Sequence, residues 1–125
     1  MILMTSPNMF IVYVSDVART VDFYRQLFDI APEFFPSPGF ATFALGEGVD
    51  LALWSGHDDA LAGDPTRTSE VCVCLSGGPE VLEAQLRTWT DLGVTVLEPP
   101  HEAVFGLTAV VADPDGNRIR LAPVD

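Results

Sequence analysis

The chain has 125 residues, of which 48% are hydrophobic, and its 18 acidic side chains against six arginines give a formal net charge of −12. This length suits a single domain with one core, and the apolar fraction argues against a disordered chain. The negative charge disfavours binding to nucleic acid or to an anionic membrane surface.

The N-terminal residues do not resemble a targeting signal. Residues 1–4 are apolar but too few for a signal peptide, and neither a basic residue before them nor a small-residue cleavage site accompanies them. No later apolar run is long enough to cross a membrane. We therefore expect a cytoplasmic protein that does not interact with membranes.

The first half of the chain predicts one helix and four strands. Residues 10–14 are β-branched and aromatic, which is typical of a buried strand. Ser15 and Asp16 suit a helix N-cap, and apolar residues then recur every three or four positions. Prolines and glycines mark the turns that follow. The expected elements are a strand at 10–14, a helix from 17 to about 29, a short strand between 32 and 39, and strands at 40–45 and 49–55.

The second half repeats this order of elements. Glycines 77 and 78 and Pro79 favour a helix start, and Gly93 favours its end. The Asp-Pro-Asp-Gly run at 113–116 is a strong turn signal. The expected elements are strands at 70–75, 94–97, 104–112 and 117–122, with a helix from 79 to 92. We place the first module at about residues 9–55, the linker at 56–68 and the second module at about 69–125 of a single domain.

The cysteines and histidines do not form a recognisable site. Cys72 and Cys74 stand two apart in a predicted strand, so they share one face, and we expect buried, reduced thiols rather than a structural disulfide. His57 and His101 fall in predicted loops, and we interpret both as surface residues. No nucleophile–base pair or phosphate-binding loop is apparent. The aromatic residues assigned to the core are Phe10, Phe23, Phe28 and Trp89.

Residues 14–17 leading into 22–24, and the closing run 112–121, resemble motifs of the glyoxalase/bleomycin-resistance/dioxygenase superfamily, also called the vicinal oxygen chelate fold. The resemblance covers essentially the whole chain. It implies an α+β fold whose two βαβββ modules form a curved mixed sheet around a cup, and a homodimer that builds each cup from halves of two chains. Features shared with phenazine-resistance members, which bind the drug, lie at 12–15, 54–56, 89–90, 104–106 and 113–120.

Metal-dependent members of this superfamily hold a divalent ion with four inward side chains, and the resemblance carries these positions over to Met9, Asp50, Glu70 and Arg120. Only Asp50 and Glu70 suit such an ion, because a guanidinium offers donors only and a thioether is a soft ligand. We therefore expect no metal, no other cofactor and no catalytic residue. Glu70 and Arg120 can instead form a structural ion pair or take part in ligand binding.

The side chains expected to line the cup follow from strand alternation. Tyr13 shares a face with Met9, and Trp54 shares one with Asp50. This mixture of aromatic groups and a few charges suits a flat, partly polar aromatic molecule. Stacking on Trp54 is worth about 0.5–1.5 kcal/mol beyond the buried area. The candidate ligand-binding residues are Tyr13, Phe43, Asp50, Trp54, Glu70, Phe105 and Arg120.

The leading hypothesis is a metal-free protein that sequesters a small aromatic compound, with an antibiotic as the expected compound, and so confers resistance. The first alternative is a metal-dependent enzyme, either a glyoxalase-like lyase or a ring-cleaving dioxygenase. The second is an interaction module whose cup is filled by its own side chains. The expected partners are the small aromatic molecule and a second copy of the chain, with no nucleic acid.

Overall fold

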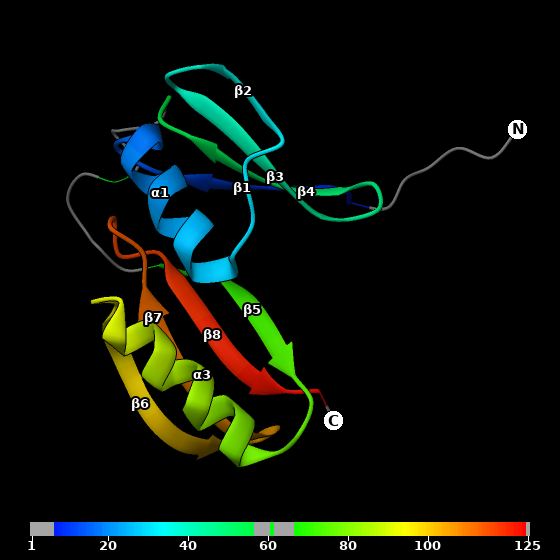
Figure 1. Cartoon of the computed structure of the whole chain (residues 1–125), viewed down its shortest axis with the longest axis vertical. Coiled ribbons are helices and arrows are strands. Elements are labelled where there is room, and N and C mark those ends of the chain that lie inside the picture. The colour runs from blue at the N-terminus through cyan, green and yellow to red at the C-terminus, as the bar shows by residue number, and fades with distance from the viewer. Residues whose placement is uncertain (1–6, 57–60, 62–66, 125) are drawn as a thin grey trace, which may run out of the picture. The chain divides into compact units, whose positions relative to one another are not determined.

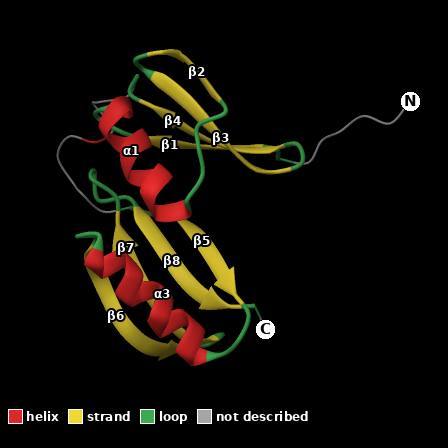
Figure 2. Cartoon of the chain, in the orientation of Figure 1, coloured by secondary structure: helices red, strands yellow, loops and turns green. Residues whose placement is uncertain are grey.

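The structure is a computed structural model that describes residues 7–56, 61 and 67–124. The chain divides into two compact units, Met1–Asp64 and Pro65–Asp125, and each is described here by itself. Within the described residues, each unit has a helix of 12 or 13 residues and a four-stranded sheet, which confirms the predicted α+β class (Figure 2). Most of the predicted linker at 56–68 lies outside the described residues. In the described part of the chain, no helix has the length and apolar character needed to span a membrane.

The first unit follows the order β-α-β-β-β (Figure 1). Its sheet has the strand order β1-β4-β3-β2, with β1 parallel to β4 and the other pairs antiparallel. The helix packs against β3 and β4. The elements are β1 (Met9–Tyr13), α1 (Val17–Phe28), β2 (Phe34–Ser37), β3 (Phe40–Gly46) and β4 (Val49–Trp54).

The second unit repeats the first one. Its sheet has the strand order β5-β8-β7-β6, again with one parallel pair, β5 and β8, and two antiparallel pairs. This identity of strand order confirms that the chain contains two βαβββ modules. The elements are β5 (Glu70–Leu75), α3 (Pro79–Asp91), β6 (Thr95–Ala103), β7 (Gly106–Ala112) and β8 (Arg118–Pro123).

Helix α1 begins and ends where the sequence predicts. An Asp16 carboxylate oxygen accepts a hydrogen bond from the Arg19 backbone N–H at 3.1 Å, which satisfies one of the free donors of the first turn. Asp29 ends the helix in the left-handed conformation, with a φ of 55°. The buried face of α1 carries Tyr24, whose ring centroid lies 6.5 Å from that of Phe43 in the sheet. The core of the first unit therefore lies between α1 and one face of its sheet.

Helix α3 starts after two glycines with positive φ, Gly77 and Gly78, which carry the chain from β5 into the helix. A proline then occupies the first turn, where its missing N–H costs little. The helix buries Leu82, Leu86 and Trp89, and Trp89 is only 2% exposed. Ile119 and Leu121 of β8 are fully buried and alternate with the two arginines of that strand. The second core therefore lies between α3 and the apolar face of its sheet.

Two sets of residues assigned to the interior are more exposed than predicted. Phe10 is 52% exposed, because β1 is an edge strand and α1 packs over β3 and β4 instead. Phe23 and Phe28 are partly buried, and both contact the ring of Tyr24. Cys72 and Cys74 are exposed rather than buried, because they lie on the sheet face opposite α3 and on the edge strand β5.

The hairpin formed by β6 and β7 differs from the prediction. The sequence placed a strand end before Pro99 and Pro100, and a new strand from 104, whereas β6 continues to Ala103 and the turn falls at Val104 and Phe105. A proline is tolerated here because β6 is the outer strand of its sheet and pairs only with β7. The register shifts twice along this pair, around Glu98, where the prolines interrupt the ladder.

Candidate ligand-binding residues

Within the described residues of each unit, the helix packs on one face of the sheet, and we call the other face the open face of that unit. In the first unit the parallel register pairs Met9 with Asp50 and Tyr13 with Trp54. Paired residues point to the same side of a sheet, and α1 covers the side that carries Phe43. These four side chains therefore lie together on the open face, in agreement with the alternation predicted from the sequence.

Two aromatic side chains dominate the open face of the first unit. The ring centroids of Tyr13 and Trp54 lie 6.3 Å apart with planes at 71°, an edge-to-face arrangement. Tyr13 is 38% exposed and Trp54 is 37% exposed. The Trp54 indole lies over Gly56, where an added Cβ would stand 2.6 Å from the indole nitrogen. Glycine at this position therefore leaves room for the indole, a role that the sequence analysis missed.

Phe43 does not belong with this group, and its assignment to the ligand site is corrected here. Its side chain is fully buried and contacts Tyr24 of α1. Phe43 pairs with Leu51, which is also buried, so both residues point to the helix-covered face. Phe40, the next aromatic residue on β3, pairs with Trp54 and shares the open face instead.

A network of charged side chains crosses the open face of the second unit. Glu70 accepts hydrogen bonds from Nε of Arg120, from Nη2 of Arg120 at 3.3 Å and from Nε of Arg118 at 3.1 Å. Arg118 also donates to Glu98, and Nη1 of Arg120 donates to the Thr108 hydroxyl at 3.1 Å. The predicted Glu70–Arg120 pair is thus present as part of a larger network.

The network also fixes the guanidinium of Arg120 beside an aromatic ring. Its Cζ lies 5.7 Å from the centroid of the Phe105 ring, within the range of a cation–π contact. The Phe105 side chain is partly exposed at the turn between β6 and β7. Glu70, Phe105 and Arg120, three of the predicted ligand-binding residues, are therefore brought together on the second unit.

Two further residues of this network, Glu98 and His101, were not predicted from the sequence. Nε2 of His101 lies 3.5 Å from Glu98 Oε1, and Nδ1 lies 2.8 Å from the Pro99 carbonyl oxygen. Both residues were assigned to a loop because the prolines between them indicated a strand end. Both could have been assigned to a strand if β6 had been recognised as the outer strand of its sheet, where proline is tolerated. His57, the other histidine, lies outside the described residues.

The ion pairs shift the pKa values of the carboxylates downward. The hydrogen bond from Arg120 is the largest cause that lowers the pKa of Glu70, with a further contribution from Arg118, while partial burial acts in the opposite direction. Arg118 likewise lowers the pKa of Glu98. In return, Glu98 raises the pKa of Arg118 and Glu70 raises that of Arg120. Both carboxylates and both guanidinium groups are therefore charged at neutral pH.

The stability that Glu70 contributes is expected to disappear in acid. Because its folded-state pKa lies below the ordinary value of 4.5, this contribution is complete above pH 4.5 and is lost as the pH falls through the lowered pKa. The difference in unfolding free energy between wild type and Glu70→Gln should be at most about 1 kcal/mol near pH 7 and should shrink toward pH 3. Urea denaturation at a series of pH values measures it.

The matched control for this measurement is Glu47→Gln, since Glu47 is an exposed glutamate in the turn between β3 and β4. Its effect on the unfolding free energy should be smaller at neutral pH. A Glu70→Gln effect that stays constant down to pH 3 would contradict the ion-pair assignment.

The side chains at the four carried-over metal positions do not fit a divalent ion. Both carboxylate oxygens of Glu70 already accept hydrogen bonds from guanidinium groups, and Arg120 has no lone pair to offer. Met9 offers only a soft thioether. Among the residues that the structure describes, no three His, Cys, Asp or Glu side chains gather as a metal-binding group.

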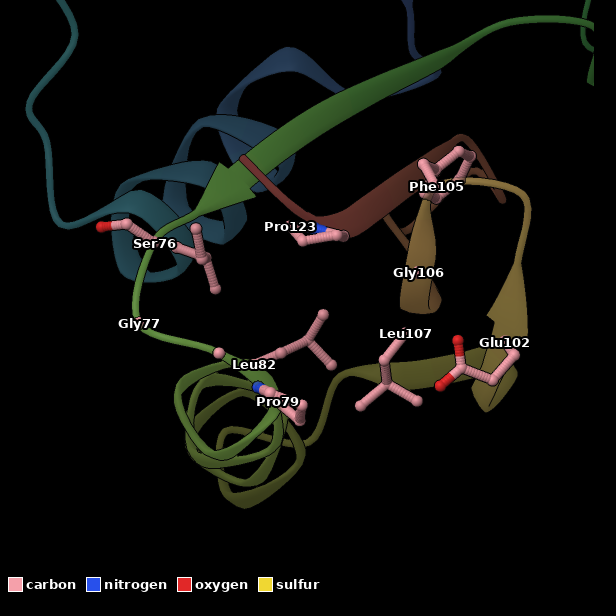
Figure 3. A pocket seen from close by; sticks show the side chains of 11 residues that line it. Ser76, Gly77, Pro79, Leu82, Glu102, Phe105, Gly106, Leu107 and Pro123 are labelled. Atoms are coloured by element: carbon pink, nitrogen blue, oxygen red, sulfur yellow. The ribbon is translucent and has the colours of Figure 1, made fainter. Parts of the chain in front are cut away.

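A pocket of about 330 Å³ lies at the N-terminal end of α3 in the second unit (Figure 3). Leu82 and Leu107 form apolar walls, Glu102 contributes a carboxylate, and Pro123 closes one side. Phe105 also lines this pocket, while its ring contacts Arg120. Of the predicted ligand-binding residues, only Phe105 lines it, and none of the charged side chains of the network does.

The chain belongs to the glyoxalase/bleomycin resistance protein/dioxygenase superfamily, whose sequence pattern it matches over residues 6–121. Among curated proteins it is 37% identical, over 123 residues, to the phenazine antibiotic resistance protein EhpR of Enterobacter agglomerans. That similarity covers 96% of this chain and 93% of EhpR. The superfamily resemblance predicted from the sequence motifs is therefore confirmed.

Solved structures show the same fold. A protein from Agrobacterium tumefaciens determined by NMR matches with a TM-score of 0.75 and 29% identity, covering 96% of this chain and 98% of that one. A glyoxalase-related enzyme from Fulvimarina pelagi also gives a TM-score of 0.75, at 22% identity, covering 95% of this chain and 88% of its own. The second likeness establishes the fold alone.

Proposed function

We propose that this protein binds a small, flat aromatic compound of the phenazine type and sequesters it without chemical change, so that the compound loses its antibiotic effect. The observation that carries the proposal is the exposed edge-to-face pair of Tyr13 and Trp54 on the open face of the first unit. Exposed aromatic groups of this size favour stacking with a planar ligand. The 37% identity to a phenazine antibiotic resistance protein supports the same class of compound.

Binding without metal chemistry is supported by the charged network of the second unit. Arg120 stands at a position where a metal-dependent member needs an electron-pair donor, and it engages the carboxylate of Glu70. We assign Glu70, Phe105 and Arg120 to ligand binding, with the guanidinium and the Phe105 ring offering a cationic and an aromatic contact. Asp50 joins Tyr13 and Trp54 as a polar contact on the first unit.

We further propose that the protein acts in the cytoplasm as a homodimer. The exposed apolar side chains of Met9 and Ile11 on β1 support association with a second copy. Sedimentation analysis at micromolar concentration should give twice the mass of the chain, and a monomer at this concentration would contradict the assignment.

The test of the proposed function is a calorimetric titration of the purified protein with phenazine, with and without EDTA. We expect saturable binding with the same Kd under both conditions, and recovery of unchanged phenazine by mass spectrometry after incubation. Loss of binding in EDTA, or conversion of the compound, would favour the metal-dependent enzyme. If no aromatic compound raises the Tm, the module with a self-filled cup is favoured instead, because a bound ligand must stabilise the native state.

A further inference from the structure

The cysteines of β5 form a pair of neighbouring thiols on the open face of the second unit. Cys72 and Cys74 are both free and exposed, and their Sγ atoms lie 3.9 Å apart. They are the two cysteines of the whole chain. Their positions are set by the strand, because residues two apart on a strand point to the same side.

This spacing does not suit a disulfide. Residues two apart on an extended strand have Cα atoms about 6.6–6.8 Å apart, at the upper limit for a disulfide. Bringing the two Sγ atoms from 3.9 Å to a bonded distance would require the strand to bend while β5 remains paired with β8. The extended pairing of β5 therefore holds the two thiols apart.

A single bridging atom fits the spacing without any bending. Two bonds of about 2.3 Å from one thiophilic atom to the two sulfurs span 3.9 Å when the angle between them is about 115°. This angle is close to tetrahedral; a pyramidal atom with three bonds prefers a narrower angle, which a small rotation of either cysteine side chain about its χ1 bond provides without moving the strand. The pair is therefore arranged to hold one such atom between its sulfurs.

The surroundings of the pair restrict the identity of that atom. Within the described residues no third His, Cys, Asp or Glu joins the two sulfurs as a metal-binding group, although soft metal ions such as zinc usually take three or four protein ligands. Partial desolvation and the neighbouring Cys74 raise the pKa of the Cys72 thiol to about 11, which disfavours the thiolates that metal ions require. A trivalent arsenic atom with one organic substituent needs only two sulfurs and reacts with protonated thiols.

We propose that Cys72 and Cys74 form a dithiol site that captures a monosubstituted trivalent arsenical, R–As=O, between its two sulfurs. Two As–S bonds form, while the As=O bond and both S–H bonds break. The two protons leave with the oxygen as one molecule of water. Neither arsenic nor sulfur changes its oxidation state, so no further reactant is required. The dithiol does not rest on the phenazine-binding proposal, because neither cysteine is assigned to that ligand, although a substituent on the arsenic would share Phe105 and Arg120 with it.

The substituent on arsenic is expected to be aromatic. Cys72 pairs in the sheet with Arg120, and the Arg120 guanidinium lies beside the Phe105 ring. A substituent that projects from the sulfur-bound arsenic over the open face therefore meets a cation and an aromatic ring, both of which stack with an aryl group. Phenylarsine oxide is accordingly the probe of choice.

The experiment incubates the reduced full-length protein with phenylarsine oxide and follows intact mass and free thiols. The mass of the wild-type chain should increase by that of one phenylarsenic group and decrease by that of two hydrogens. Both free thiols should disappear together. Cys72→Ser and Cys74→Ser should bind about 100-fold more weakly, because the second bond in wild type is intramolecular. Excess mercaptoethanol should remove the group from each single variant but not from wild type, whereas ethanedithiol should remove it from wild type.

Circular dichroism and Tm establish that both serine variants fold, as expected for exposed positions. The proposal is overturned if either folded variant binds phenylarsine oxide as tightly as wild type. Uptake of two arsenic groups per chain would also overturn it, since this outcome requires each thiol to react alone.

Discussion

Replacing Trp54 by alanine is expected to weaken phenazine binding at least about tenfold, or about 1.4 kcal/mol, while the protein stays folded. The indole is 37% exposed on the open face and contributes both apolar area and a stacking surface. Loss of the apolar area and of the stacking surface lowers the affinity for phenazine, and it leaves no cavity in the core. Calorimetric titration with phenazine measures the change in Kd, and thermal denaturation measures Tm.

Phe35 provides the matched control for this substitution. It is an aromatic residue of β2 in the same unit and is 42% exposed, yet it is not among the proposed ligand-binding residues. Phe35→Ala should leave the Kd for phenazine unchanged. If Trp54→Ala binds phenazine as well as wild type but unfolds more easily, Trp54 is a packing residue and the proposed site on the first unit is wrong.

The second tryptophan is expected to behave in the opposite way. Trp89→Ala should lower the free energy of unfolding by about 3–5 kcal/mol, because its indole is 2% exposed in the core beneath α3 and its removal leaves a cavity. Urea denaturation at pH 7 and 25 °C measures the loss. A loss below about 1 kcal/mol, the typical effect of a point substitution, would contradict the assignment of Trp89 to the core.

Most of the fold could be predicted from local signals. The cap at Asp16 and the regular spacing of apolar residues gave the bounds of α1, and the paired glycines before Pro79 gave the start of α3. These signals act within a few residues of the chain, so they can be recognised without knowledge of the tertiary structure. The extent of β6 could not be recognised in this way, because only the position of a strand in its sheet decides whether it tolerates proline.

The side of the sheet on which a candidate residue lies could be predicted where alternation along one strand was sufficient. The faces of β1, β4, β5 and β8 were assigned correctly, and so was the contact between Glu70 and Arg120. Phe43 was misplaced because its side depends on the pairing of β3 with β4, which shifts by one residue between Ala44 and Gly46. A shift of one residue moves a side chain to the opposite face, and it cannot be recognised from composition alone.

The prolines of the outer strands affect which sheet edges can pair with a strand of another polypeptide. β2 carries Pro36 and β6 carries Pro99 and Pro100, and each of these strands borders its sheet on one side. A border without a full row of N–H donors is a poor template for fibril growth. β1 and β5, at the opposite borders, contain no proline, so any strand added from another polypeptide is directed to them.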